Sequence, residues 1–466
     1  MIPGGAASPA ARPHRKFIID LICRQYCILQ VTNTFVCMLT ASVQKTAEKK
    51  SVYGLVAWAA FASFATYFCM YGFRKPFSAT TFDGEKAFGI SFKSALVVAQ
   101  VFGYMMAKFI GIKFISEVNK AKRAFYILSL IGAAEISLLL LAITPKPFNV
   151  FFLFTNGLSL GLIWGLVFSF IEGRKFTDLL ALILSTNFIF SSGVAKTLGR
   201  VCIEYWKIPE IYTPFTSGLL YIPLLLLAVW MLTRIPAPTP EETASRGVRV
   251  TLNGRERMAL FMKFFTGLVA ITILNLLLTI LRDLKDNYGV EILRTVKPSF
   301  TPAIFTQMET SAAVIVLVLL LFLTGFKQHF KSIAAHHIAI GCGLVIILLS
   351  SLFLRLHLLD PVFNLVVYTI GLYVCYNTLQ CLFLDRFIAA FKIKGNIGFF
   401  FYFMDSVGYL GSCFIIVNKE IFSPKVNWLN YFLTVSFILG VVGLISIIVS
   451  WIYFNRKYKS MALTTT

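Results

Sequence analysis

A guanidinium group stands near the end of the first long apolar run, in the sequence YFCMYGFRKPFSA. Tyr67, Tyr71 and Arg74 follow one another at i, i+4 and i+7, so a helix presents them on one face. The planar fork of arginine matches a carboxylate or phosphate through two hydrogen bonds, and two phenols beside it suit an oxyanion. The pattern predicts an anion site. The alternative is that Arg74 anchors its helix at a membrane surface.

A second arginine closes a similar stripe in the second half of the chain. Asn275, Thr279 and Arg282 share a helix face, and Arg282 follows a long apolar run, as Arg74 does. If the two halves are related by pseudo-two-fold symmetry, both arginines face one central cavity. Two converging guanidinium groups favour an anion of more than one charge.

Other ionisable residues lie inside apolar runs, where each costs about 2.5–3.5 kcal/mol on insertion scales and therefore faces a cavity or a partner. Lys108 shares a stripe with Gln100 and Tyr104, which favours a cavity over snorkelling towards a membrane surface. Lys196 is open to the same two interpretations. Glu135 is explained by pairing with a neighbouring helix.

Two carboxylates in the second half are candidates for coupling or gating. Glu309 is placed to pair with Arg282 or Lys108 in the empty state, so that an arriving phosphate displaces it. Alternatively, Glu309 or Asp405 carries a proton, because burial favours the neutral form of a carboxyl group.

Glycines and an indole mark the fourth apolar run. Gly157, Gly161 and Gly165 are spaced by four residues, which predicts close helix packing. Trp164 beside them either packs at that contact or lines the cavity.

The sequence holds no P-loop, HExxH or nucleophile elbow, and its five histidines form no metal-binding pattern. His336 and His337 lie beside a polar loop and are expected to be solvated. We therefore expect no enzyme, no metal site and no cofactor.

The composition identifies the elements that position these residues. Of 466 residues, 58% are hydrophobic and 14% are charged, too few charges for a soluble protein of this size. The formal net charge of +22 would suggest nucleic acid in a soluble protein, but the basic residues cluster between apolar runs, as membrane topology demands. The expected partners are therefore the lipid bilayer and a small anionic substrate, with no nucleic acid and a monomeric chain.

Apolar runs of about 20 residues, the length of a membrane-crossing helix, recur twelve times. The expected spans are 52–75, 92–116, 123–143, 148–172, 177–203, 213–234, 259–283, 299–325, 333–355, 361–385, 396–418 and 430–454. They predict an all-α membrane protein with two pseudo-symmetric six-helix bundles. The expected parts are an N-terminal extension (1–50), the first bundle (51–234), a linker (235–258), the second bundle (259–455) and a tail (456–466).

Basic residues predict the orientation. Alternate loops, the linker and the tail are rich in Lys and Arg, whereas the opposite loops are short and mixed in sign, as at Asp83 with Lys86. The positive-inside rule then places both termini and the linker in the cytoplasm. We expect the chain to lie in the inner (plasma) membrane.

The first fifty residues fit no clean span, because FIIDLICRQYCILQVTNTFVCML carries Asp20 and Arg24. A signal anchor, a surface helix and a true start at Met38 all remain open.

Several of these segments resemble the organophosphate:phosphate antiporters of the major facilitator superfamily, such as the glycerol-3-phosphate and hexose-phosphate transporters. The runs YFCMYGFRKPFSA, GYMMAKFIGIKFISEVNKAKR, ILRD and GYLGS are similar to motifs of that family. The resemblance implies a major facilitator fold and the following substrate-site residues: Arg74, Tyr67, Tyr71, Lys108, Arg282, Tyr409 and Trp164, with Glu309 at a family glutamate position.

The sequence departs from that family in two helices. The family's histidine in the fifth span has no counterpart here, and Asn187, Ser191 and Lys196 occupy that helix, while Asp405 is an addition in the eleventh span. The leading hypothesis is a secondary transporter of a phosphorylated or other anionic solute, with phosphate as a possible exchange partner. The alternatives are a proton-coupled permease for another solute and a non-transporting membrane sensor.

Overall fold

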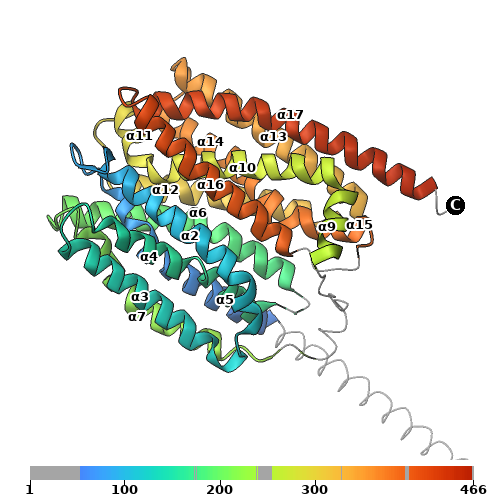
Figure 1. The fold of residues 1–466 in the computed structure, drawn as a ribbon, viewed down its shortest axis with the longest axis horizontal. Coiled ribbons are helices and arrows are strands. Elements are labelled where there is room, and N and C mark those ends of the chain that lie inside the picture. The colour runs from blue at the N-terminus through green and yellow to red at the C-terminus, as the bar shows by residue number, and fades with distance from the viewer. Residues whose placement is uncertain are drawn as a thin grey trace, which may run out of the picture. The chain divides into compact units, whose positions relative to one another are not determined.

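The computed structural model describes residues 53–463, with gaps at 173, 175, 238, 240–253, 327 and 394–397 (Figure 1). The chain divides into two compact units, Met1–Trp58 and Ala59–Thr466, and the description below concerns the second. The N-terminal extension with Met38, and most of the expected linker, lie outside the described residues.

After the first span, the described elements are helices apart from two short strands, β1 and β2. In chain order they are η1 (Pro76–Ala79), β1 (Lys86–Ala87), β2 (Ile90–Ser91), α2 (Phe92–Glu117), η2 (Lys120–Lys122), α3 (Arg123–Ile143), α4 (Val150–Leu160), α5 (Ile163–Ile171), α6 (Thr177–Glu204), α7 (Thr213–Thr233), α9 (Gly254–Lys263), α10 (Phe265–Asn287), α11 (Gly289–Val296), α12 (Ala303–Thr324), α13 (His329–Arg355), α14 (Pro361–Asn377), η3 (Thr378–Phe383), α15 (Leu384–Ala390), α16 (Gly398–Phe422) and α17 (Trp428–Leu463). β1 and β2 pair antiparallel, with Lys86 opposite Ser91.

Twelve helices among the described residues are long and apolar enough to cross a membrane, beginning with Tyr53–Arg74 and ending with Trp428–Met461. Six precede the linker and six follow it, which confirms the predicted architecture. The seventh span begins later than predicted, because exposed α9 forms a separate short helix before α10. The described part of the expected tail is also helical, since α17 runs on to Leu463.

Two pairs of helices join the two halves of the chain. α2 packs against α16, and α6 packs against α12, so each contact brings one helix from either side of the linker together. The blue-to-green and yellow-to-red ribbons of Figure 1 meet along these helices. Residues carried by α2, α6, α12 and α16 are therefore close to the boundary between the halves.

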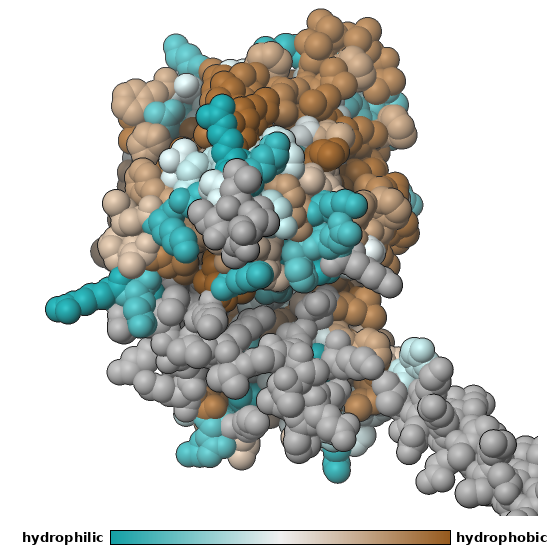
Figure 2. All heavy atoms as spheres, turned by 90° about the vertical axis from the view of Figure 1, so that its right-hand side faces the viewer, coloured by the Kyte–Doolittle hydropathy of each residue, from teal (hydrophilic) through white to brown (hydrophobic). Residues whose placement is uncertain are grey.

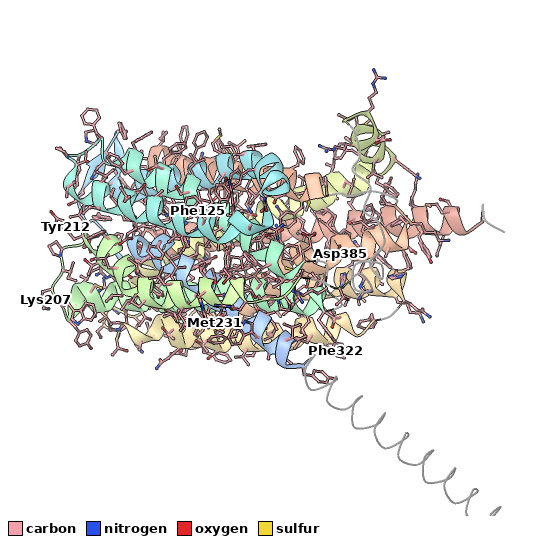
Figure 3. All side chains as sticks on the ribbon, turned by 90° about the horizontal axis from the view of Figure 1, so that it is seen from below. Phe125, Lys207, Tyr212, Met231, Phe322 and Asp385 are labelled. Carbon is pink, nitrogen blue, oxygen red and sulfur yellow. The ribbon has the colours of Figure 1, made fainter. Side chains whose placement is uncertain are left out.

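The loops lie at the two ends of the helices. We call the end next to the linker the linker end and the opposite one the far end. The linker end carries α9 and α15, and the far end carries η1, β1, β2 and α11. Figure 3 labels Lys207 and Tyr212 at the far end and Asp385 towards the linker end. Figure 2 views the linker end, where hydrophilic side chains gather and the upper and right flanks are apolar.

The glycines of the fourth span bring α4 against α2, as predicted. A Cβ added at Gly157 would lie 2.2 Å from the backbone oxygen of Gln100, and one at Gly161 would lie 2.5 Å from Cβ of Ala107. Neither neighbour is the flexible end of a side chain, so only small residues allow this approach.

Gly157→Val is therefore expected to destabilise the protein by about 1–3 kcal/mol, the usual cost of overpacking. The matched control is Gly132→Val, because an added Cβ at Gly132 meets nothing within 4 Å. Thermal unfolding of the two detergent-solubilised variants tests the prediction, and equal midpoints would contradict it.

Candidate functional site

A small cavity of about 60 Å³ lies between the two halves of the chain. Its lining side chains come from the first span, α2, α5 and α6 on one side and from α10, α14, η3 and α16 on the other. They include Tyr67, Tyr71, Arg74, Tyr104, Lys108, Trp164, Arg282, Tyr376, Gln380, Asp405 and Tyr409. Seven of the predicted substrate-site residues therefore meet in one place, together with Asp405.

Hydrogen bonds to the end of the first span fix the position of Arg74. A helix leaves its last carbonyl groups without intrahelical partners. Here Asn156 Nδ2 donates to the carbonyl oxygen of Phe73 at 3.2 Å, and Gln100 Nε2 donates to that of Arg74 at 3.1 Å. Gln100 also donates to Asn156 Oδ1 at 2.9 Å. The predicted stripe partner Gln100 thus holds the backbone of Arg74 instead of lining the cavity.

The guanidinium group of Arg74 is buried, and no described residue serves as its counter-ion. The residue is 6% exposed, and its Cζ lies 4.0 Å from the centre of the Tyr104 ring. Among the described residues no carboxylate lies within ion-pair distance of it, and its Nε has no hydrogen-bond partner. A cation–π contact lowers the cost of burying this charge, but it leaves the hydrogen-bonding fork free.

Arg282, by contrast, already has a carboxylate. Its Nη2 lies 2.9 Å from Oδ1 of Asp283, its Nε donates to the same oxygen at 3.2 Å, and its Nη1 donates to the hydroxyl of Tyr376. Asp283 is the next residue in the sequence, within ILRD, and sequence reasoning overlooked it as a partner. Both arginines line the cavity, but among the described residues a carboxylate pairs with Arg282 and none pairs with Arg74.

Lys108 pairs with a residue of the other half. Its Nζ lies 3.3 Å from Oδ2 of Asp405, and both side chains are buried. Gln380 Nε2 donates to the other oxygen of Asp405 at 2.8 Å and to Asn275 Oδ1 at 2.6 Å. Lys108 therefore does not snorkel, and the carboxylate beside it is Asp405, not Glu309.

Aromatic rings form much of the cavity wall. Tyr67 and Tyr71 meet edge to face at 5.6 Å between ring centres, and Tyr104 meets Tyr409 in the same way across the halves. Trp164 stacks on Phe401 of the opposite half at 6.1 Å. Aromatic faces and phenols suit a small organic molecule with both apolar and polar surfaces.

A π-helical segment, Thr378–Phe383, brings Gln380 and Cys381 to the cavity. Such segments occur frequently at functional sites, because the extra residue in the turn redirects side chains. The apolar pattern of the tenth span gives no sign of this segment, so Gln380 was not predicted. Tyr376, in the last turn of α14 just before it, was also missed.

Two predicted site residues do not line this cavity. Lys196, only 1% exposed, lies with its Nζ 2.6 Å from Oδ1 of Asp286, whose Oδ2 lies 2.5 Å from Nζ of Lys75. Glu309 pairs with Lys285, not with Arg282 or Lys108 as the sequence suggested. These residues form a buried charge cluster on the far-end side of the cavity.

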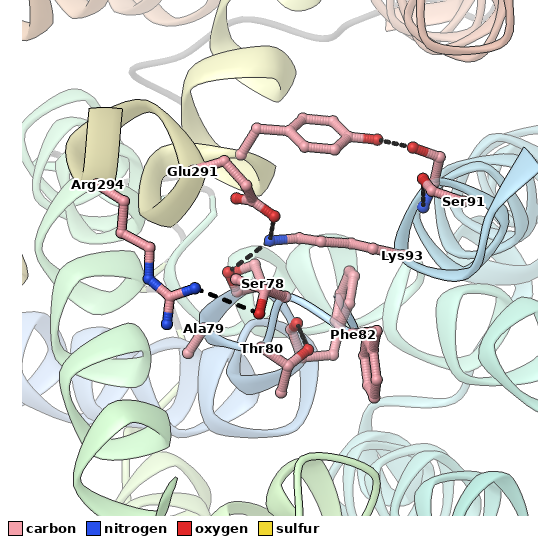
Figure 4. A network of polar contacts seen from close by, with 12 residues as sticks. Ser78, Ala79, Thr80, Phe82, Ser91, Lys93, Glu291 and Arg294 are labelled. Atoms are coloured by element: carbon pink, nitrogen blue, oxygen red, sulfur yellow. Dashed lines mark hydrogen bonds and ion pairs between the residues drawn. The ribbon is translucent and has the colours of Figure 1, made fainter. Parts of the chain in front are cut away.

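The far end is held together by ion pairs between the halves. Lys93 Nζ lies 2.5 Å from Oε1 of Glu291 and donates to the carbonyl oxygen of Ser78 at 3.2 Å (Figure 4). Burial raises the pKa of the Glu291 carboxyl, and Lys93 opposes that change. The hydroxyl of Ser94 donates to Glu420 Oε1 at 2.7 Å. In these two contacts the first half supplies Lys93 and Ser94, and the second half supplies the carboxylates of Glu291 and Glu420.

Solved structures with the same architecture cover most of the chain. A mutant of the nucleoside transporter NupG matches with a TM-score of 0.53 and 16% identity over 86% of this chain and 100% of that one. A D-xylose-proton symporter matches with 0.56 and 13% identity over 86% and 97%. A structure on substrate recognition in proton dependent oligopeptide transporters matches with 0.57 and 12% identity over 87% and 99%.

At these identities the likeness establishes the fold, which is the twelve-helix major facilitator fold predicted from the sequence. These three structures are not of organophosphate:phosphate antiporters, so that narrower resemblance stays a prediction. No curated protein matches the chain. A family profile described as "Family of unknown function (DUF5690)" matches residues 76–457, and the chain therefore belongs to this family.

Proposed function

We propose that the protein is a secondary active transporter that moves an anionic organic solute, such as a phosphorylated one, across the inner membrane. The observation that carries the proposal is Arg74, a buried cation in the central cavity whose guanidinium group has no hydrogen-bonding or ion-pair partner among the described residues. A buried charge is costly unless it is paired, so the missing partner is expected to arrive as substrate.

The charges around the cavity indicate how much negative charge the substrate brings. Arg74, Lys108 and Arg282 supply three cations, and Asp405 and Asp283 supply two carboxylates. One positive charge is left over, so a monoanion neutralises the site directly. A dianionic phosphate group must also draw Lys108 or Arg282 away from its carboxylate. The sequence suggested two arginines that both bind the anion directly, but Arg282 is already paired with Asp283.

Alternating access explains the closed far end and the small cavity. The cavity of about 60 Å³ is too small for an organic anion, so such a substrate enters only if the halves separate at one end. The cross-half ion pairs close the far end in this conformation. Rocking of the halves about the cavity would open each end in turn. The positive-inside rule favours a cytoplasmic linker end.

The test is uptake into proteoliposomes that contain the purified protein. Antiport predicts that labelled phosphate enters only when phosphate or an organic phosphate is loaded inside, and that a protonophore does not reduce the uptake. Failure of every anion to exchange or accumulate would contradict the proposed function.

A proton-coupled permease is the second candidate, and the buried Lys108–Asp405 pair favours it. Protonation of Asp405 would break this link between the halves and so couple a proton to their movement. Two of the similar structures are described as proton-dependent transporters, which makes the mechanism worth testing here. Uptake that collapses with a protonophore would favour it over antiport.

Asp405→Asn separates the two mechanisms within one variant. The substitution leaves Lys108 unpaired and raises the excess charge of the cavity from one to two. Under the anion proposal, affinity for a phosphate dianion is then expected to rise about tenfold relative to a monocarboxylate, since one more charged contact forms. Competition of the two anions against labelled substrate measures the ratio. An unchanged ratio with lost accumulation would indicate a proton carrier.

A further inference from the structure

A groove of about 670 Å³ runs between α13 and α17 on the outside of the second half. The two helices pack side by side, and Figure 1 shows them adjacent. The walls are apolar and include Ile338, Gly341, Val345, Leu444, Ile448 and Trp451. The groove is separate from the central cavity and shares no lining residue with it.

Gly341 opens this groove. An added Cβ there would meet nothing within 4 Å, so the surface is hollow at this position. Ile338 and Ile448 beside it are 67% and 55% exposed. Both helices are membrane spans, so these exposed apolar side chains face hydrocarbon rather than water.

The imidazole of His337, which also lines the wall, already has hydrogen-bond partners on both ring nitrogens. Nδ1 of His337 is 2.8 Å from the carbonyl oxygen of Ile333, and Nε2 is 3.0 Å from the hydroxyl of Ser450. His337 is buried, contrary to the expectation that it is solvated. Besides His337, only Cys342 and Trp451 bring a polar atom to the described part of the wall, which otherwise consists of aliphatic side chains and Gly341 and therefore fits a hydrocarbon chain.

Two lysine side chains lie near the linker end of the groove. Lys331 precedes Ile338 by seven residues and Lys459 follows Ile448 by eleven, so each lies on the same helix face as the groove residue. Both lysines are exposed, and Phe330 stacks on Tyr458 at 3.9 Å between ring centres beside them. Two basic side chains at the membrane surface complement a negative headgroup.

We propose that this groove binds a phospholipid with an anionic headgroup. One acyl chain lies along Gly341 between α13 and α17, and the phosphate lies near Lys331 and Lys459. Burial of the chain supplies affinity, and the two lysines supply headgroup preference.

Gly341→Leu tests the acyl-chain site, because an added Cβ at this position meets nothing within 4 Å and the rest of the new side chain would occupy the groove. Gly132→Leu in α3 is the matched control, since nothing lies within 4 Å of an added Cβ there either. Both proteins are purified in detergent with added palmitoyl-oleoyl phosphatidylglycerol or phosphatidylcholine, and native mass spectrometry counts the retained lipids.

Wild type and Gly132→Leu are expected to retain one phosphatidylglycerol per chain, and Gly341→Leu to lose it at least tenfold. Lys331→Gln with Lys459→Gln is expected to abolish the preference for phosphatidylglycerol over phosphatidylcholine. Equal retention by the two leucine variants would overturn the proposal. The proposal would also be overturned if wild type had the mass of a dimer and Gly341→Leu that of a monomer, because a second copy of the chain would then fill the groove.

Discussion

Replacing Arg74 with lysine is expected to weaken anion uptake about 10- to 100-fold while leaving the protein folded. A hydrogen bond to a charged group contributes roughly 1.5–3 kcal/mol. The 10- to 100-fold loss follows if lysine makes one of the two hydrogen bonds that the guanidinium group makes to the anion. Lysine keeps the positive charge but presents a point charge instead of a planar fork. The measurement is the concentration dependence of labelled-anion uptake into proteoliposomes.

Arg355→Lys is the control for this substitution. Arg355 lies at the far end of α13, where its Nη2 donates to the Thr434 hydroxyl at 2.9 Å on the exposed surface. The control is expected to transport like wild type. If Arg74→Lys also transported like wild type, Arg74 would be a structural cation, and the anion site would have to be sought elsewhere.

Asp286→Asn is expected to destabilise the conformation with a closed far end by about 3–5 kcal/mol, the usual effect of removing one partner of a buried ion pair. Asp286 lies between Lys75 and Lys196, both from the first half, so the substitution leaves two buried lysines without their carboxylate. The thermal midpoint is expected to fall, and transport to fall with it, because the far end no longer closes tightly.

Asp83→Asn provides the matched control at the same end. Asp83 faces Arg294 at 3.5 Å, but its side chain is 80% exposed. Solvent screens such a pair, so its loss is expected to change stability by no more than about 1 kcal/mol. Equal midpoints for Asp286→Asn and Asp83→Asn would show that the buried cluster does not hold the halves together.

The twelve spans were predictable because a bilayer requires about 20 apolar residues for each crossing and the sequence alternates such runs with basic loops. The stripe of Tyr67, Tyr71 and Arg74 was equally readable, because helical periodicity places i, i+4 and i+7 together. In the structure all three line the central cavity. Of the corresponding stripe in α10, only Arg282 reaches it.

Pairing between distant helices was not predictable from one sequence. Glu309 had several cations within its possible reach, and nothing along the chain selects Lys285 over Arg282. Lys196 looked like a site residue because a buried lysine needs a partner, but that partner is Asp286 in the other half. The π-helical segment at Gln380 depends on packing that leaves the apolar pattern unchanged.

The most direct test of the central claim is anion binding to the purified protein, read as a shift of its thermal midpoint. The panel contains inorganic phosphate, sugar phosphates, monocarboxylates and neutral sugars, added to wild type and to Arg74→Ala. We predict that at least one anion raises the midpoint of wild type, that no anion raises that of Arg74→Ala, and that neutral sugars do nothing. A shift by neutral sugars alone, or an anion shift that survives in Arg74→Ala, would contradict the account.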